Sequence, residues 1–325
     1  MRYTNIPSLL AAALVAATFS SAVVAQNWDL PTGYAPTNFH TVNINKFATA
    51  VGQATDGKLK INVHPGASLY KMPEIKRAVQ SGQVPIGEVL MVTLSNENPL
   101  FAIDGMPFFA SSYEQAEKLW KVQKPEIEKI LAKQGLKLLF AVPWPPQGLM
   151  ADKEVNSVSD LAGLSFRAYD RQTSRLAELF KARPVTIQAA EVAQALSTGK
   201  INSLIASAQS AVDYKAWESI KYFYDIQAWL PKNMVVVSLA EFNSLSPTLQ
   251  QALVKAGQDA EAAGWIASKE IAAQTKKTLE KNGMNVLTPS KELVDGLNQL
   301  GTIMLEEWLV NAGPEGKAVV QAFRQ

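Results

Sequence analysis

The sequence contains no cysteine and only two histidines, His40 and His64. Without thiols the chain can form no disulfide and offers no thiolate nucleophile, so its stability must come from buried apolar side chains. Neither histidine lies in an HExxH pattern, and no GxSxG nucleophile motif is present. We therefore predict no metal site, no cofactor and no catalytic residue.

A strong charge of either sign is also missing. Lys and Arg total 31 against 29 Asp and Glu. A nearly neutral protein exerts no long-range attraction on a charged polymer, so we predict no nucleic-acid partner. With 325 residues and 47% hydrophobic positions, the chain is long enough for a globular protein of two lobes.

The first 25 residues differ from the rest. Arg2 precedes an apolar, small-residue stretch over 7–24, and the small residues Val23 and Ala25 stand before Gln26. This pattern is typical of a secretory signal peptide. A retained membrane anchor is the alternative, but the stretch is rich in Ala and Ser and no second span follows. We expect export, with cleavage near Ala25.

The remainder alternates strand and helix patterns, which predicts an α/β fold with parallel sheets and helices on both faces. The expected strands are 58–65, 82–90, 136–144, 164–169, 183–188, 201–207 and 229–242. The expected shorter helices are 43–55, 72–82, 174–182 and 191–199. Two such sheets fit the length.

Two longer helical segments are also expected. Residues 112–135 read as a helical pair broken at Pro125, and 246–283 read as one helix with only Gly257 and Gly264 to interrupt it. At 1.5 Å per residue the second would span roughly 55 Å, more than one lobe, so it should cross both. The lobes that we expect are 26–143 plus about 235–270, and 144–234 plus about 271–325.

Four segments, in order, resemble a known family: "TDGKLKINVHPGASL", "IKRAVQSGQVPIGEV", "SVSDLAGLSFRAYD" and "ARPVTIQAAEVAQALSTGKINSL". Over essentially the whole mature chain, the sequence is similar to the periplasmic substrate-binding subunits of tripartite ATP-independent (TRAP) transporters, the dicarboxylate-type extracytoplasmic solute receptors. The resemblance implies a two-lobed periplasmic binding protein with a hinge. It also implies that the protein delivers an organic acid to a TRAP membrane permease and is not an enzyme.

Arg167 occupies the family position whose arginine pairs with the ligand carboxylate. The residue type suits that role, because a guanidinium stays charged and matches a carboxylate in two-point geometry. Buried without an anion it would cost several kcal/mol, so it needs a partner. That partner is the ligand or, in the alternative, Asp170, Asp160 or Glu191.

Further ligand-binding candidates lie where strands end at the expected cleft. They are Tyr34, Asn38, Phe39, Glu88, Met91, Trp144, Gln147, Tyr169, Ser207, Gln209 and Asn233. Glu88 is a specificity candidate for a ligand hydroxyl, because its charge would repel an acid. The alternatives are helix capping for Asn38, hinge packing for Trp144 and local backbone bonds for Ser207, Gln209 and Asn233. His40 reads as a surface or helix-start residue rather than a ligand contact, and His64 reads as structural.

The segment "INSLIAS" departs from the family pattern, since many relatives have "VDGQENP" there. The pocket should therefore be less polar, with Phe39, Trp144, Tyr169 and Trp229 near it. This favours a monocarboxylate that carries an apolar or aromatic group. A receptor for another importer class, a ligand sensor and, least favoured, a periplasmic enzyme remain alternatives, and a helix that crosses both lobes would favour the TRAP type.

Overall fold

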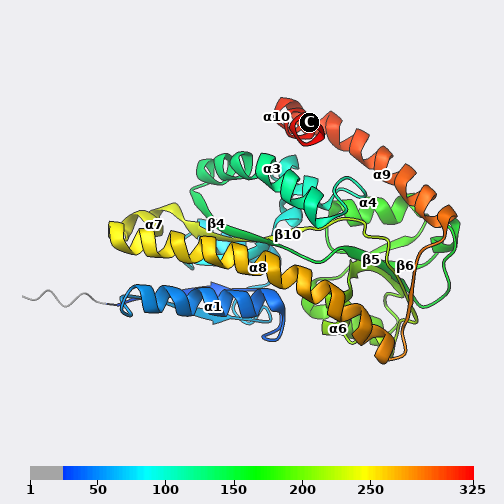
Figure 1. Ribbon diagram of the computed structural model, residues 1–325, viewed down its shortest axis with the longest axis horizontal. Coiled ribbons are helices and arrows are strands. Elements are labelled where there is room, and N and C mark those ends of the chain that lie inside the picture. The colour runs from blue at the N-terminus through cyan, green and yellow to red at the C-terminus, as the bar shows by residue number, and fades with distance from the viewer. Residues whose placement is uncertain (1–24) are drawn as a thin grey trace, which may run out of the picture.

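The computed structural model describes residues 25–325, so residues 1–24 of the expected signal peptide lie outside it. The strands in this range form three sheets, of two, three and six strands (Figure 1). Within the same range, no helix combines the length and the apolar character that crossing a membrane requires.

Two of the sheets lie in one half of the molecule. β1 (Gln26–Pro31) and β2 (Leu59–His64) form a parallel pair. The other sheet has the order β3 (Ile86–Leu90), β10 (Lys232–Ser238), β4 (Leu136–Pro143). The helices of this part include α1 (Phe39–Ala54), α2 (Met72–Gln80) and α3 (Tyr113–Lys133). The expectation of purely parallel sheets is wrong here, because β10 returns from the other half and runs antiparallel to both neighbours.

The six-stranded sheet forms the other half. Its order is β11 (Asn285–Leu287), β9 (Tyr222–Tyr224), β5 (Gln147–Ala151), β8 (Ser203–Ser207), β6 (Ser165–Ala168), β7 (Arg183–Thr186). β6 is parallel to β7 and β8, as expected, whereas β5 is antiparallel to β8 and β9. Its helices include α4 (Arg171–Leu179), α5 (Val192–Ser197) and α6 (Ala208–Asp213).

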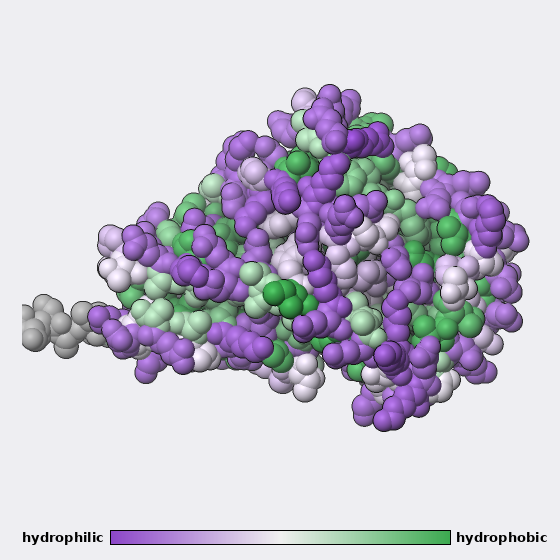
Figure 2. Space-filling view, in the orientation of Figure 1, coloured by the Kyte–Doolittle hydropathy of each residue, from purple (hydrophilic) through white to green (hydrophobic). Residues whose placement is uncertain are grey.

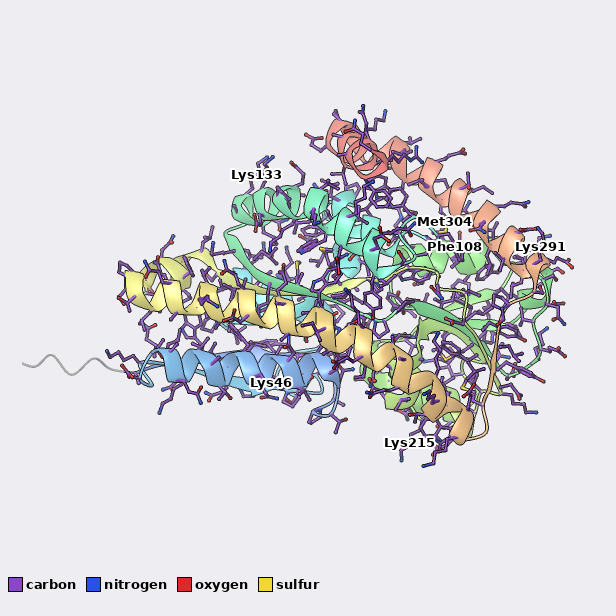
Figure 3. All side chains as sticks on the ribbon, in the orientation of Figure 1. Lys46, Phe108, Lys133, Lys215, Lys291 and Met304 are labelled. Carbon is purple, nitrogen blue, oxygen red and sulfur yellow. The ribbon has the colours of Figure 1, made fainter. Side chains whose placement is uncertain are left out.

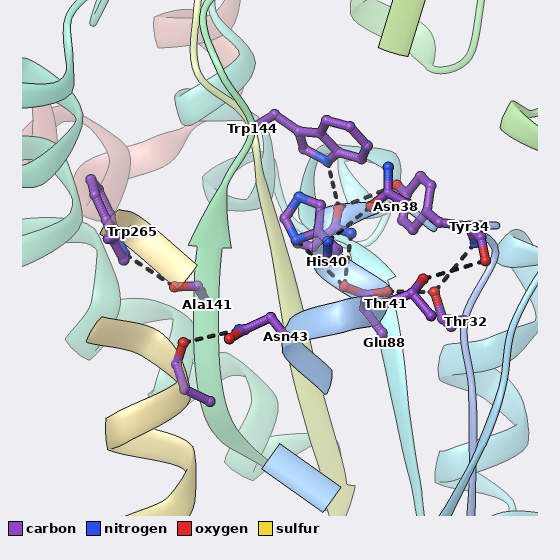
Figure 4. Close-up of polar contacts among 12 residues, drawn as sticks. Thr32, Tyr34, Asn38, His40, Thr41, Asn43, Glu88, Ala141, Trp144 and Trp265 are labelled. Carbon is purple, nitrogen blue, oxygen red and sulfur yellow. Dashed lines mark hydrogen bonds and ion pairs between the residues drawn. The ribbon is translucent and has the colours of Figure 1, made fainter. Parts of the chain in front are cut away.

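The helix α8 (Pro247–Lys281) confirms the expected long helix and crosses both halves (Figure 1). One end packs against α1 and β4, and the other packs against α6 and β11. Asn43 of α1 donates a hydrogen bond to the Ala260 carbonyl at 3.0 Å, and the Trp265 indole donates to the Ala141 carbonyl of β4 at 3.2 Å (Figure 4). The two halves are therefore two lobes that share one helix. The lobe boundaries given above stay a prediction.

Several local expectations were wrong. α3 continues through Pro125, because this proline is exposed while buried Trp120 and Ile127 on either side hold the helix against the core. The strand expected at 229–242 is shorter, and its last part is the helix α7 (Leu239–Ser244). α9 (Lys291–Asn311) and α10 (Gly313–Arg324) were not anticipated, and α10 packs against α3.

Short 3-10 helices complete the connections. They are η1 (Met91–Leu94), η2 (Pro99–Gly105), η3 (Val158–Leu161), η4 (Ala189–Glu191) and η5 (Ala216–Glu218). The face seen in Figure 2 is mostly hydrophilic, with apolar side chains in separate patches. Figure 3 shows Lys46 and Lys133 on the outer sides of their helices, while Met304 of α9 is buried.

Candidate functional site

A pocket lies between the two halves, and Arg167 is part of its wall. Residues from both halves line it: Tyr34, Met72, Leu90, Thr93, Trp144, Gln147, Arg167, Tyr169, Gln188, Ala189, Ala206, Ser210, Tyr214 and Pro231. The space between these side chains measures about 480 Å³, including its opening to solvent.

Arg167 projects from β6 and is only 5% exposed. Its Nε donates a hydrogen bond to the Ile187 carbonyl at 3.1 Å, and its guanidinium lies over the rings of Tyr169 and Tyr214, 4.9 and 5.9 Å from their centroids. Among residues 25–325 no carboxylate forms an ion pair with it. The aromatic faces stabilise the cation but do not neutralise it.

The three carboxylates considered as internal partners for Arg167 have other roles. Asp170 caps α4 and accepts from the Thr173 backbone N–H at 2.7 Å. Asp160 accepts from the backbone N–H groups that precede η3, and Glu191 accepts from the Gln188 backbone N–H at 3.4 Å. None of the three forms an ion pair with Arg167, although Asp170 is near enough for the Arg167 charge to lower its pKa.

On the opposite wall, Asn233 of β10 holds two aromatic side chains in place. Its Oδ1 accepts hydrogen bonds from the Tyr34 hydroxyl at 3.2 Å and from the Trp144 indole N–H at 3.0 Å. The two rings meet edge to face, 5.0 Å apart. Asn233 itself does not line the pocket, so it fixes the orientation of two residues that do.

Glu88 also lies behind this wall and does not line the pocket. Its carboxylate accepts from the Thr32 hydroxyl at 2.5 Å and from Asn233 Nδ2 at 2.9 Å, and His40 Nδ1 lies 3.7 Å away. Burial raises the pKa of Glu88 to about 7, although both hydrogen bonds lower it, and burial lowers the pKa of His40 well below its usual range. In this structure Glu88 serves the hydrogen-bond network rather than the pocket surface.

At the rim, Asn38 and Gln209 converge on Asp213, which the sequence analysis did not single out. Asn38 caps α1, as the capping alternative proposed, and its Nδ2 donates to Asp213 Oδ2 at 2.7 Å. Gln209 Nε2 donates to Asp213 Oδ1 at 2.6 Å. Burial raises the pKa of Asp213 to about 6, although both hydrogen bonds lower it. These contacts join α1 of one half to α6 of the other.

Of the remaining candidates, Phe39, Met91 and Ser207 are buried without lining the pocket. Phe39 is the first residue of α1 rather than part of the loop, and it packs edge to face on Trp144. Ser207 caps α6, accepting from the Ser210 backbone N–H at 3.1 Å.

Three further residues lie outside the pocket. His40 is the second residue of α1, as expected, but it is buried rather than at the surface. Trp229 is 2% exposed and does not line it. His64 lies beside Asp29 at 2.9 Å, away from the pocket, in keeping with its structural interpretation.

The candidates that line the pocket are therefore Tyr34, Trp144, Gln147, Arg167 and Tyr169. The other nine lining residues were not predicted to be site residues. Gln188, Ala189, Ser210 and Tyr214 follow β7 and β8, so the rule that ligands bind beyond the carboxyl ends of parallel strands could have found them. Met72 arrives from α2, and no local signal marks it.

A second cavity shares Met72, Gln188 and Ala189 with the pocket. The N-terminus of α2, including Lys71, and the η4 segment form its other walls. Because the two cavities share these three residues, they lie side by side at the boundary between the halves.

The pocket wall contains few side chains that could carry a charge. Arg167 is its only charged residue, and no histidine, aspartate or glutamate lines it. Among residues 25–325, no group of three or more histidine, aspartate or glutamate side chains is arranged to hold a metal ion.

Comparison with known proteins identifies the family. The model of the bacterial extracellular solute-binding proteins, family 7 (DctP), matches residues 33–299. The chain belongs to this family. It is a TRAP extracytoplasmic solute receptor, a periplasmic class whose members capture a solute and deliver it to a membrane permease.

Three solved structures show the similarity in detail. DctP6 of Bordetella pertussis, a receptor that binds pyroglutamic acid, is 48% identical with a TM-score of 0.91, covering 92% of this chain and 99% of its own. DctP7 of the same organism, which also binds pyroglutamic acid, is 41% identical with a TM-score of 0.91, covering 93% and 100%. A pyroglutamate-specific TRAP receptor from a marine metagenome is 40% identical with a TM-score of 0.91, covering 93% and 99%.

Proposed function

We propose that this receptor captures pyroglutamate or a close analogue, a small monocarboxylate with a lactam ring, and that Arg167 binds the carboxylate. The observation that carries the proposal is a buried guanidinium in the pocket wall with no carboxylate partner among the described residues. The three structures above, 40 to 48% identical, bind this acid and support the choice of ligand.

The charge of the pocket argues for one carboxylate rather than two. Arg167 is the only charged residue in the wall, so a second carboxylate would be buried without a counter-ion, at a cost of several kcal/mol. Tyr34, Trp144, Tyr169 and Tyr214 offer broad apolar faces to the body of the ligand. A dicarboxylate or a sugar acid fits these surroundings less well.

We assign the proposed site residues to two roles. Direct contact is proposed for those that line the pocket: Tyr34, Trp144, Gln147, Arg167 and Tyr169. Support of these side chains or of closure is proposed for the others: Asn38, Phe39, Glu88, Met91, Ser207, Gln209 and Asn233. The supporting argument is the set of hydrogen bonds and packing contacts described above.

The mechanism is binding and closure without catalysis. Ligand enters the open cleft, its carboxylate meets Arg167, and the other half closes over it as the backbone bends near 142–145 and 233–237. Closure removes water and strengthens the ion pair. The closed form then presents to the TRAP permease a surface that the open form lacks. The absence of histidine, aspartate and glutamate from the pocket wall argues against acid–base chemistry there.

We place the mature protein in the periplasm, after cleavage of the signal peptide near Ala25. The support is the sequence pattern and the periplasmic location of the family. Mass spectrometry of the exported protein tests the position, since an N-terminus at Gln26 is expected. A retained leader would contradict it.

Calorimetric titration of the mature protein with L-pyroglutamate tests the function. The Arg167→Ala variant should bind more weakly by about 2 to 5 kcal/mol, the range for losing one member of a buried charge pair. Arg171→Ala is the matched control, because Arg171 is exposed and lines a different cavity. Unchanged affinity in a folded Arg167→Ala protein would overturn the role of Arg167, and no binding by the wild type would overturn the ligand.

A further inference from the structure

Gln147 is held rigidly at the pocket wall. It is the first residue of β5 and lies opposite Ser207 of β8. Its backbone N–H donates to the Trp229 carbonyl at 3.0 Å, and its carbonyl accepts from the Ala228 N–H at 2.9 Å. The residue is only 4% exposed, so its side chain has little freedom to turn away from the pocket.

The orientation of the Gln147 amide follows from one contact. Its Nε2 donates to the Pro145 carbonyl at 2.8 Å. A carbonyl oxygen only accepts hydrogen bonds, so the amide nitrogen must face Pro145 and the amide oxygen must point the other way. That oxygen accepts no hydrogen bond from residues 25–325. Gln147 therefore has a free acceptor to offer a ligand, while the Pro145 carbonyl holds one of the two N–H groups of its amide.

An acceptor at this position restricts the ligand. Gln147 lies on β5 and Arg167 on β6, with β8 between them. Gln147 is level with Ser207 of β8, whereas Phe166, the residue before Arg167, is level with Ser203, so the backbones of Gln147 and Arg167 are about 14 Å apart at the usual spacings. Side chains of this length bring the two groups to the same small pocket. The amide oxygen would repel a carboxylate, so the ligand must offer it a hydrogen.

The source of that hydrogen is restricted by charge. An ammonium group would add a second cation beside Arg167 in a wall with no carboxylate, and that cation would lack a partner. A neutral N–H carries no such penalty. A lactam or secondary amide next to the carboxylate offers the Gln147 oxygen a hydrogen and adds no charge. A free amino acid also offers a hydrogen, but its ammonium group adds a positive charge.

We infer that Gln147 selects ligands that carry a neutral N–H beside the carboxylate, by accepting that hydrogen bond. This inference rests on the proposed function and names the group by which the receptor separates lactam acids from lactones and from free amino acids. Gln147 is a specificity-determining residue, and Arg167 supplies the shared affinity for the carboxylate.

The test compares two ligands of nearly equal shape. L-Pyroglutamate and its lactone counterpart, 5-oxotetrahydrofuran-2-carboxylate, differ in one ring atom, N–H against O. Calorimetry on the wild type should give about 10- to 100-fold weaker binding of the lactone, because the Gln147 oxygen is then buried without a donor. L-Proline, whose nitrogen is charged, should bind at least as weakly as the lactone.

The Gln147→Met variant links the preference to the residue. Methionine keeps the length of the side chain and removes the acceptor, so lactam and lactone should bind within about threefold of each other. Unfolding without ligand checks that the variant is folded, and the two-ligand comparison on the wild type needs no variant. A lactone that binds the wild type as tightly as the lactam, or a preference that persists in Gln147→Met, overturns the inference and leaves the function intact. No binding of either ligand by the wild type overturns both.

Discussion

Asn38 and Asp213 are 175 residues apart in the chain, yet the Asn38 amide donates to the Asp213 carboxylate at 2.7 Å. Asn38 caps α1 in one half and Asp213 ends α6 in the other, beside the pocket residue Tyr214. A hydrogen bond to a charged acceptor stabilises by about 1.5 to 3 kcal/mol when it forms. The contact therefore ties the rims of the two halves together.

Removing this contact should weaken ligand binding without touching the ligand. We expect Asp213→Ala to lower the affinity for pyroglutamate about 5- to 20-fold, mainly through faster dissociation, because an open cleft releases its ligand. Asn38→Ala should lower the affinity similarly. The double variant should lose less binding free energy than the sum of the losses in the two single variants. Stopped-flow and calorimetry measure these effects.

Asn45→Ala provides the matched control on α1. Asn45 donates only to the Thr41 carbonyl within its own helix, at 3.0 Å. Its loss should leave the dissociation rate unchanged. Full additivity of Asn38→Ala and Asp213→Ala would contradict a direct bond between the two residues.

The buried carboxyl of Glu88 should make stability depend on pH. Burial raises its pKa from 4.5 to about 7, so between these values the folded state binds more protons than the unfolded state. Stability from this group is then greatest below about pH 4.5 and falls as pH rises toward 7. His40, whose Nδ1 lies 3.7 Å from Glu88, stays neutral because burial lowers its pKa.

Glu88→Gln removes this titration while Thr32 and Asn233 keep a hydrogen-bonding partner. Relative to the variant, the wild type should lose about 2 to 3 kcal/mol of unfolding free energy between pH 4.5 and 8. Urea denaturation of both proteins across this range measures the difference. A difference that stays constant with pH would refute the assignment.

The indole N–H of Trp144 should matter for binding as well as for stability. Trp144→Phe keeps the ring contact with Tyr34 but removes the hydrogen bond to Asn233. We expect a loss of about 1 kcal/mol in stability and about 3- to 10-fold in affinity. Trp265→Phe, which removes a similar bond to the Ala141 carbonyl far from the pocket, should lower stability but leave affinity unchanged. Equal effects of both variants on affinity would argue against a specific role for Trp144.

Gly264 should tolerate alanine poorly although it lies inside a helix. A Cβ there would meet the buried Val142 side chain at 2.4 Å, so α8 would have to move away from β4. We expect Gly264→Ala to destabilise by about 1 to 3 kcal/mol despite the better helix propensity of alanine. Gly52→Ala in α1 is the control, because nothing lies within 4 Å of its Cβ, and it should stabilise by about 0.5 to 1 kcal/mol. Thermal or urea unfolding measures the stability of both variants. A Gly264→Ala protein that is more stable than the wild type would show that α8 is not packed this closely against β4.

Patterns along the chain predicted most helices, the length of α8 and the place of Arg167 on its strand. These are local properties, because periodicity and turn residues act over a few positions. Strand direction in the sheets was not predictable in the same way, since β10 pairs with β3 and β4 across long separations. Pro125 was overestimated as a helix break because burial of Trp120 and Ile127 on either side outweighs it.

The candidate site, like the fold, was predictable from the sequence only in part. The sequence by itself determined that Arg167 needs an anion, because a guanidinium cannot lose its charge and a buried one cannot stay unpaired. Only the tertiary structure decided that Asp170, Asp160 and Glu191 serve other bonds, that Glu88 lies behind the pocket and that Asp213 meets Asn38. These outcomes depend on which side chains the fold brings within hydrogen-bonding distance, and a linear sequence does not contain those distances.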